Sequence, residues 1–228
     1  MTGLGGNAGS GPRIGLVHAL YGSIVPIERA FRASWPEATL ASLYDQSLYL
    51  EFDRAGRTTA YIERRIETLL RLSVEAGSEA ILFTGSLFGA PVRAVAADLP
   101  VPVLTAYEAM IEDAFATAAR PRLGLVATVQ GTIDMMRADI ESHARDNATT
   151  VEVDCRLAEG AMEALQAGDQ ARHDALVADT ASALAGADAI LLGQFSMAPV
   201  AERLGQAGIG PVLTSPGSAV AKLRRLLG

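Results

Sequence analysis

The chain has 228 residues, half of them hydrophobic and a fifth charged, as in an ordinary globular protein that buries a substantial core. Its formal net charge of −7 argues against a nucleic-acid partner, because binding a phosphate backbone needs clustered Lys and Arg. Cys155 is the only cysteine, which rules out an internal disulfide and provides no cysteine cluster for a metal.

Residues 1–12 have neither the charged nor the apolar segment of a secretion signal, and we expect them to form a flexible leader. No apolar run approaches the roughly 18 residues needed to cross a bilayer, so no membrane association is expected. The cytoplasm is the default location.

From residue 13 on, short apolar runs alternate with longer amphipathic stretches, a pattern typical of α/β proteins with parallel sheets. We expect strands at 14–20, 39–44, 80–83, 101–104, 123–127, 150–153, 189–192 and 212–214. We expect helices at 24–34, 58–76, 131–143 and 159–185, a bridging segment at 106–120 and a last helix at 215–228.

The second half of this pattern repeats the first at an offset of 109 residues. RIGLV at 13–17 returns as RLGLV at 122–126, and PVLT at 102–105 returns unchanged at 211–214. Two copies of one supersecondary unit predict two similar lobes related by a pseudo-two-fold axis, with a site between them. The first lobe is expected to comprise 13–105 plus 215–228, and the second 106–214.

Ligands of open parallel sheets bind beyond the carboxyl ends of the strands, so the residues after each strand are informative. A glycine followed by a hydroxyl residue opens a helix in both copies, as Gly22-Ser23 and as Gly131-Thr132. Free N–H groups and hydroxyls at such turns suit a carboxylate or phosphate oxygen, although ordinary N-capping is the alternative interpretation. The third strands lead into Thr84-Gly85-Ser86 and Gly193-Gln194-Phe195-Ser196, where Gly85 corresponds to Gln194 and the two are expected to approach each other.

These segments resemble the aspartate/glutamate racemase superfamily, which includes hydantoin racemases, maleate isomerase and arylmalonate decarboxylase. The resemblance covers nearly the whole chain after residue 12. It rests on the duplicated lobes, VATVQGT at 126–132, ILFTGSLFG at 81–89 and ILLGQFSMAP at 190–199. It implies two α/β lobes and cofactor-independent chemistry next to a carboxylate.

The chain departs from the family pattern at both catalytic positions. Gly85 and Gln194 stand where the resemblance places two cysteines, and racemisation in the family needs both thiols as bases. Decarboxylases of the group share the glycine but keep the second cysteine. Cys155 is not a substitute by position, and we expect a buried, inert thiol.

The remaining candidates are polar residues at the predicted strand ends. As catalytic residues we select His18, Ser86 and Gln194, since a histidine can exchange protons near neutral pH. Both His18 and Asp45 also have a purely structural interpretation. His18 could donate to a backbone carbonyl at the strand end, and Asp45 could cap a helix. The residues expected to bind substrate are Tyr21, Gly22, Ser23, Asp45, Thr84, Gly85, Thr128, Gly131, Thr132, Phe195 and Ser196. For Glu108 two roles are open: it donates or accepts a proton in the reaction, or it interacts with the dipole at the start of a helix. His143 and His173 are expected on the surface.

Three hypotheses stay open. The first is a cofactor-independent isomerase or lyase that acts at the carbon alpha to a carboxylate or carbonyl of a small anionic substrate, through an oxyanion pocket. The second is a catalytically silent protein that binds small carboxylates. The third is that Gly85 is an engineered replacement of a cysteine. No metal and no cofactor are expected, and a homodimer is the expected assembly because such dimers are commonest.

Overall fold

The computed structural model describes residues 11–228, which form two compact units. One unit runs to Ala106 and includes Ala219–Gly228, and the other spans Tyr107–Ser218. The predicted leader lies outside the described residues except for its end, where Gly11 N–H donates to Glu37 O at 2.8 Å. Among the described residues, no helix combines the length and the apolar composition that a membrane span requires.

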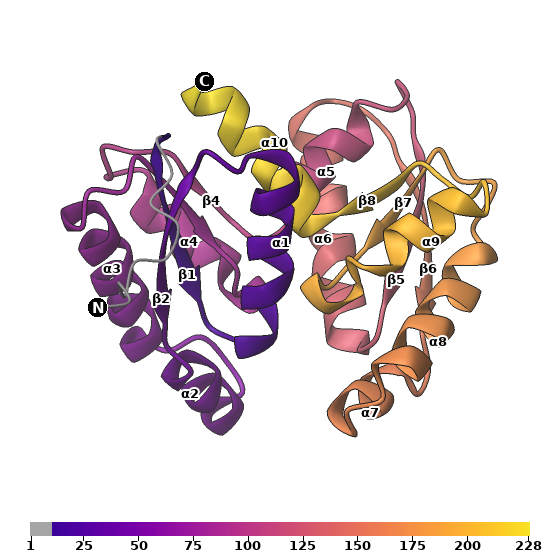
Figure 1. The fold of residues 1–228 in the computed structure, drawn as a ribbon, viewed down its shortest axis with the longest axis horizontal. Helices are drawn as coiled ribbons and strands as arrows, with labels where there is room; N and C mark the ends of the chain where they lie inside the picture. Colours follow the sequence, from indigo (N-terminus) through magenta and orange to yellow (C-terminus); the bar gives the residue numbers. More distant parts are fainter. Residues whose placement is uncertain (1–10) are drawn as a thin grey trace, which may run out of the picture. The chain divides into compact units, whose positions relative to one another are not determined.

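The first unit is built on a four-stranded parallel sheet in the order β2-β1-β3-β4. Its strands are β1 (Arg13–His18), β2 (Thr39–Tyr44), β3 (Ala80–Phe83) and β4 (Val103–Leu104). Its helices are α1 (Ile24–Ser34), α2 (Ser47–Ala55), α3 (Ala60–Glu75) and α4 (Gly89–Ala96). The sheet lies between α1 and α3 (Figure 1), and β3 is buried along its whole length, which explains its unbroken apolar sequence.

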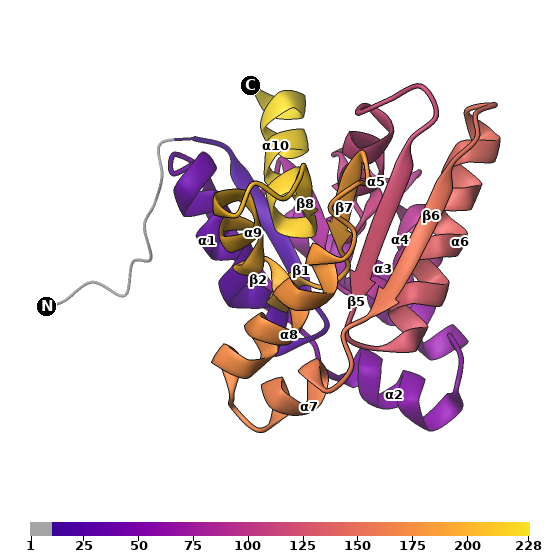
Figure 2. The same ribbon diagram turned by 90° about the vertical axis from the view of Figure 1, so that its right-hand side faces the viewer.

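The second unit repeats this plan with the strand order β6-β5-β7-β8. Its strands are β5 (Arg122–Ala127), β6 (Glu152–Leu157), β7 (Ala189–Leu192) and β8 (Val212–Thr214). Its helices are α5 (Glu108–Phe115), α6 (Gln130–Asp146), α7 (Ala161–Gln166), α8 (Gln170–Ser182), α9 (Val200–Gln206) and the start of α10 (Ser215–Leu227). Here α6 and α8 lie on opposite sides of the sheet (Figures 1 and 2).

The repeat extends to individual hydrogen bonds at the start of each central strand. Arg13 N–H donates to Glu79 Oε1 at 2.9 Å, and Arg122 N–H donates to Asp188 Oδ2 at 2.8 Å. The prediction of an α/β fold with two parallel-sheet lobes is therefore confirmed. The pseudo-two-fold axis and a site between the lobes stay predictions.

The helix expected over 159–185 is wrong, because the chain breaks into α7 and α8 around Gly168, whose φ is +79°. Asp169 then caps α8 by accepting a hydrogen bond from Arg172 N–H at 3.0 Å. Helix α2 was not predicted, although Asp45 before it and the left-handed Gly56 after it are ordinary start and stop signals.

Candidate functional site

Three side chains meet at the carboxyl edge of the first sheet, and we call His18, Ser23 and Thr84 the His18 cluster. His18 ends β1 and Thr84 follows β3, and because these neighbouring strands are parallel, their ends reach the same edge. His18 Nδ1 lies 3.0 Å from Ser23 Oγ and 3.1 Å from Thr84 Oγ1, and the two hydroxyl oxygens are 2.8 Å apart. The structure thus brings together three of the predicted site residues.

His18 is fully buried, and burial lowers its pKa from 6.5 to about 4. The imidazole is therefore neutral at neutral pH and is only a weak base. This corrects the expectation that His18 exchanges protons near neutral pH without any tuning. Its Nε2 atom is buried and has no hydrogen-bond partner among the residues that the structure describes.

In the second unit, Thr128 and Gln194 form the Thr128–Gln194 pair at the carboxyl edge of the sheet. Thr128 follows β5 and Gln194 lies just beyond β7. Both the backbone N–H and the hydroxyl of Thr128 donate to Gln194 Oε1, each at 2.7 Å. Because a backbone N–H can only donate, the amide oxygen must face Thr128, and the amide NH₂ points away from it.

The turns that open the helices after β1 and β5 are alike and have open space at their glycines. Ser23 N–H donates to Leu20 O, and Thr132 N–H donates to Val129 O, both at 3.2 Å. A Cβ atom built on Gly22 or Gly131 would meet nothing within 4 Å. No side chain caps either turn, so the first N–H groups of each turn can donate hydrogen bonds to a ligand oxygen.

Gly85 lies in a tight place that a side chain does not fit. A Cβ atom there would come within 2.6 Å of Phe83 Cε1 and within 3.0 Å of both Ala19 Cβ and Phe88 Cδ2. Phe83 and Phe88 are buried core residues that pack edge to face, with ring centroids 6.2 Å apart. A cysteine at position 85 would therefore force these rings to move.

Ser86 lies beside a residue that the sequence did not single out. Tyr49 of α2 places its hydroxyl 3.3 Å from Ser86 Oγ, and its ring packs against Phe88 at 5.2 Å. Burial raises the pKa of Tyr49, so the phenol keeps its proton at neutral pH. Tyr49 was not predicted as a site residue, because no sequence motif marks it and the helix that carries it, α2, was not predicted.

Asp45 is held by contacts within its own unit. Its Oδ1 accepts from Ser47 N–H at 2.9 Å at the start of α2, and its Oδ2 pairs with Arg65. Burial alone would raise the pKa of Asp45, but the hydrogen bonds from Ser47 and Arg65 outweigh it and lower the pKa. These are the contacts of a helix cap, and a substrate-binding role for Asp45 stays a prediction.

The other candidates occupy varied surroundings. Tyr21 is 70% exposed and packs edge to face on Tyr44. In the 3-10 turn after β7, Phe195 is buried and Ser196 is half-buried, whereas Glu108 lies in the first turn of α5.

Two expectations outside the site are wrong. His173 is fully buried, because it shares a face of α8 with the buried Val177 and Ala181, and its Nδ1 lies 2.7 Å from Asp174 Oδ1. Cys155 is half-buried rather than buried, and Arg137 Nε donates to its sulfur at 3.3 Å. His143 is half-buried beside Phe115, with ring centroids 4.6 Å apart.

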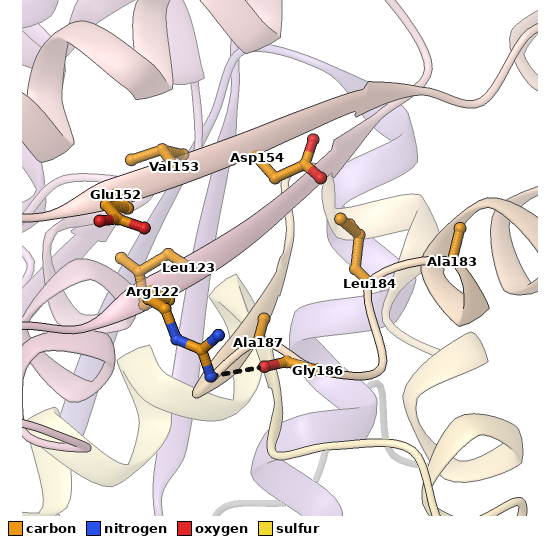
Figure 3. A pocket seen from close by; sticks show the side chains of 9 residues that line it. All are labelled: Arg122, Leu123, Glu152, Val153, Asp154, Ala183, Leu184, Gly186 and Ala187. Atoms are coloured by element: carbon orange, nitrogen blue, oxygen red, sulfur yellow. Dashed lines mark hydrogen bonds between the residues drawn. The ribbon is translucent and has the colours of Figure 1, made fainter.

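A groove of about 530 Å³ lies elsewhere in the second unit, where β5 and β6 begin (Figure 3). There the Arg122 guanidinium donates to Gly186 O at 3.0 Å, with Glu152 and Asp154 on the neighbouring strand. Neither Thr128 nor Gln194 lines this groove, which opens at the amino end of the strands. Within residues 11–228, no three His, Cys, Asp or Glu side chains are grouped so as to hold a metal ion.

Comparisons with known proteins place these observations in a family. A model of the Asp/Glu/hydantoin racemase family matches residues 26–223. No curated protein sequence matches the chain.

The fold is similar to that of several solved structures. Allantoin racemase from Klebsiella pneumoniae is 20% identical, with a TM-score of 0.67 over 95% of this chain and 87% of its own. Picrophilus torridus aspartate racemase is 12% identical, with a TM-score of 0.68 over 96% and 95%. Unliganded arylmalonate decarboxylase is 18% identical, with a TM-score of 0.64 over 96% and 94%. At these identities the likeness shows the fold alone.

Proposed function

The chain belongs to the Asp/Glu/hydantoin racemase family, and from that premise we propose a cofactor-independent isomerase or lyase. It acts at the carbon alpha to a carboxylate or carbonyl of a small anionic substrate. The observation that carries this proposal is that both sheets have uncharged hydrogen-bond donors beyond the carboxyl ends of their strands. These are the N–H groups of the uncapped turns at Gly22 and Gly131 and the NH₂ of Gln194, which is turned away from Thr128.

Such donors suit an enolate or enediolate. They are preorganised by the turns and by the Thr128–Gln194 pair, so they need little rearrangement when negative charge develops on a substrate oxygen. Removal of a single donor of this kind typically costs an enzyme about a hundredfold in rate. Breaking or making a bond at the neighbouring carbon is the reaction that such donors accelerate.

Of the two reaction types, the lyase is supported better. An isomerase must remove a proton from a carbon acid, which needs a strong base, and two-thiol racemisation is unavailable to a chain with one cysteine. Burial makes His18 a weak base, and Asp45 is engaged by Ser47 and Arg65. A decarboxylase needs no such base.

Decarboxylation of a malonate illustrates the step. The bond between the alpha carbon and one carboxylate breaks, carbon dioxide leaves, and the electron pair forms an enediolate on the remaining carboxylate. The enediolate is basic enough to take a proton from a hydroxyl group. We assign this proton transfer to Ser86, whose Oγ–H gives its proton to the alpha carbon. The serine oxygen then takes the proton of the Tyr49 hydroxyl, 3.3 Å away, and water returns a proton to the tyrosine.

The second candidate function is a catalytically silent protein that binds small carboxylates. One observation favours it: Gln194 Oε1 already occupies both donors of Thr128, so these are not free for a substrate. The two candidates differ in turnover and not in binding.

To test the proposal, the protein is incubated with malonate and substituted malonates in deuterium oxide. Carbon dioxide release is measured, and the deuterated monoacid is followed by proton NMR. The lyase predicts turnover that falls about 100-fold in Ser86→Ala and is unchanged in Ser34→Ala, a matched serine at the exposed end of α1. Deuterium exchange into monocarboxylates without carbon dioxide release would instead indicate an isomerase. Ligand-dependent stabilisation with neither reaction would leave the silent binding protein.

A further inference from the structure

The protons of the His18 cluster can be counted. Ser23 Oγ–H donates to Leu20 O at 2.8 Å, so the serine proton is not available to its neighbours. The 2.8 Å contact between Ser23 Oγ and Thr84 Oγ1 then requires the proton of Thr84, because the other acceptor of this hydroxyl, Val17 O, lies farther away at 3.4 Å. Both hydroxyl protons are thereby used, and the contacts of His18 Nδ1 at 3.0 and 3.1 Å need a third proton, which only the ring can supply.

The opposite tautomer is disfavoured at two places. With the proton on Nε2, either the Ser23–Thr84 contact or the Ser23–Leu20 contact would place two oxygens 2.8 Å apart with no proton between them. The Nε2–H group would in addition be a buried donor with no acceptor among the described residues. The contacts therefore favour a neutral ring with its proton on Nδ1.

In this tautomer, Nε2 is a buried lone pair that can only accept a hydrogen bond. A carboxylate oxygen cannot bind it, because both atoms are acceptors. A hydroxyl or an amide N–H of a ligand can. None of the described residues donates to Nε2, which leaves this acceptor available to a group from outside them.

The position suits a ligand contact. His18 ends β1, and Leu20 and Tyr21, which follow it closely in the chain, are exposed. The repeat places Ala127 at the corresponding position of β5, so the carboxyl edge of the second sheet has no such acceptor, and the other buried Nε2 without a partner, that of His173, lies on α8. A histidine acceptor at the end of the central strand is therefore found in the first unit alone.

From these contacts we infer that the protein selects small carboxylates that also carry a hydroxyl or amide N–H group, which donates to His18 Nε2. This rests on the proposed function, since the ligand is the substrate of that reaction. The carboxylate binds the N–H donors of the turn at Gly22, which lies in the same unit as His18, and the neutral donor group sets the specificity.

The tautomer is measured directly by nitrogen-15 NMR of histidine-labelled protein at neutral pH. The chain has three histidines, so His143→Asn and His173→Asn assign two sets of signals and leave the third to His18. We expect the proton of His18 on Nδ1 and the signal of an unprotonated nitrogen for Nε2. A proton found on Nε2 overturns the inference, and this measurement on the unaltered protein does not depend on whether the His18 variant folds.

Ligand selection is measured with malonate, hydroxymalonate and methoxymalonate, by calorimetry or thermal shift. We expect hydroxymalonate to bind about tenfold more tightly than the other two, the usual effect of one additional hydrogen bond. His18→Asn removes Nε2 and should abolish the difference, whereas His143→Asn should keep it. Equal affinities, or no binding of hydroxymalonate, overturn the inference. Selective binding without carbon dioxide release would instead refute the lyase and leave the donor requirement standing.

Discussion

The two units carry polar pairs at equivalent edges, yet the chemistry of the pairs differs. Both join a residue at the end of the central strand to one 66 positions later, His18 to Thr84 in the first unit and Thr128 to Gln194 in the second. The first pair contains a titratable and fully buried histidine, whereas the second contains no titratable group. A duplicated backbone can therefore be kept while the side chains at its two edges take different tasks, here an acceptor and a set of donors.

The largest expected difference between the two edges is in their contribution to folding stability in acid. The folded protein keeps His18 neutral down to about pH 4, but in the unfolded chain it takes up a proton near pH 6.5. Between these values the unfolded state binds more protons, so stability falls as the pH falls, by roughly 3 kcal/mol in total.

Urea unfolding between pH 7 and about pH 4.5 measures this effect. His18→Asn should lose most of the pH dependence, and the His143→Asn control should keep it. An unchanged pH dependence in His18→Asn would show that folding does not shift the pKa of His18, and the contrast between the two edges would be lost.

A smaller effect is expected from a cysteine at position 85. Gly85→Cys should destabilise the first unit by about 1–3 kcal/mol, because its Cβ atom overpacks against Phe83 and Phe88. Urea unfolding provides the measurement, and Gly22→Ala, whose Cβ enters open space, is the control. Full stability together with a gain of turnover would support the hypothesis that Gly85 is an engineered replacement of a cysteine.

The smallest loss of folding stability is expected at the edge of the second sheet. Gln194→Ala should cost about 1 kcal/mol, because the N–H and hydroxyl of the buried Thr128 lose their acceptor and water replaces it only in part. Gln194→Glu keeps an oxygen acceptor and should be close to neutral in stability, while its charge weakens carboxylate binding. Gln130→Ala, at an exposed glutamine of α6, is the control for both. A stability loss equal to that of Gln130→Ala would show that the Thr128–Gln194 pair contributes nothing.

The sheets were predictable from local patterns. A strand buried on both faces has a continuous apolar sequence, so β3 and β7 were predicted with the bounds that the structure shows. The offset of 109 residues then predicted two matching sheets. Short helices were missed or merged, as α2 and the break between α7 and α8 show, because a few residues carry too little periodicity to separate a helix from a loop.

The site was predictable in its location and not in its chemical state. Position at the end of a parallel strand, which can be read along the chain, selected His18, Ser23, Thr84, Thr128 and Gln194. Whether His18 is protonated depends on the desolvation of its ring by residues distant in sequence, and the orientation of the Gln194 amide depends on a donor 66 residues away. The sequence by itself determined the duplicated parallel sheets and the polar edge residues, because strand patterns and repeats are local. Only the tertiary structure decided that one edge holds a neutral acceptor and the other an amide donor, because burial and hydrogen-bond partners arise from contacts that the folded chain creates.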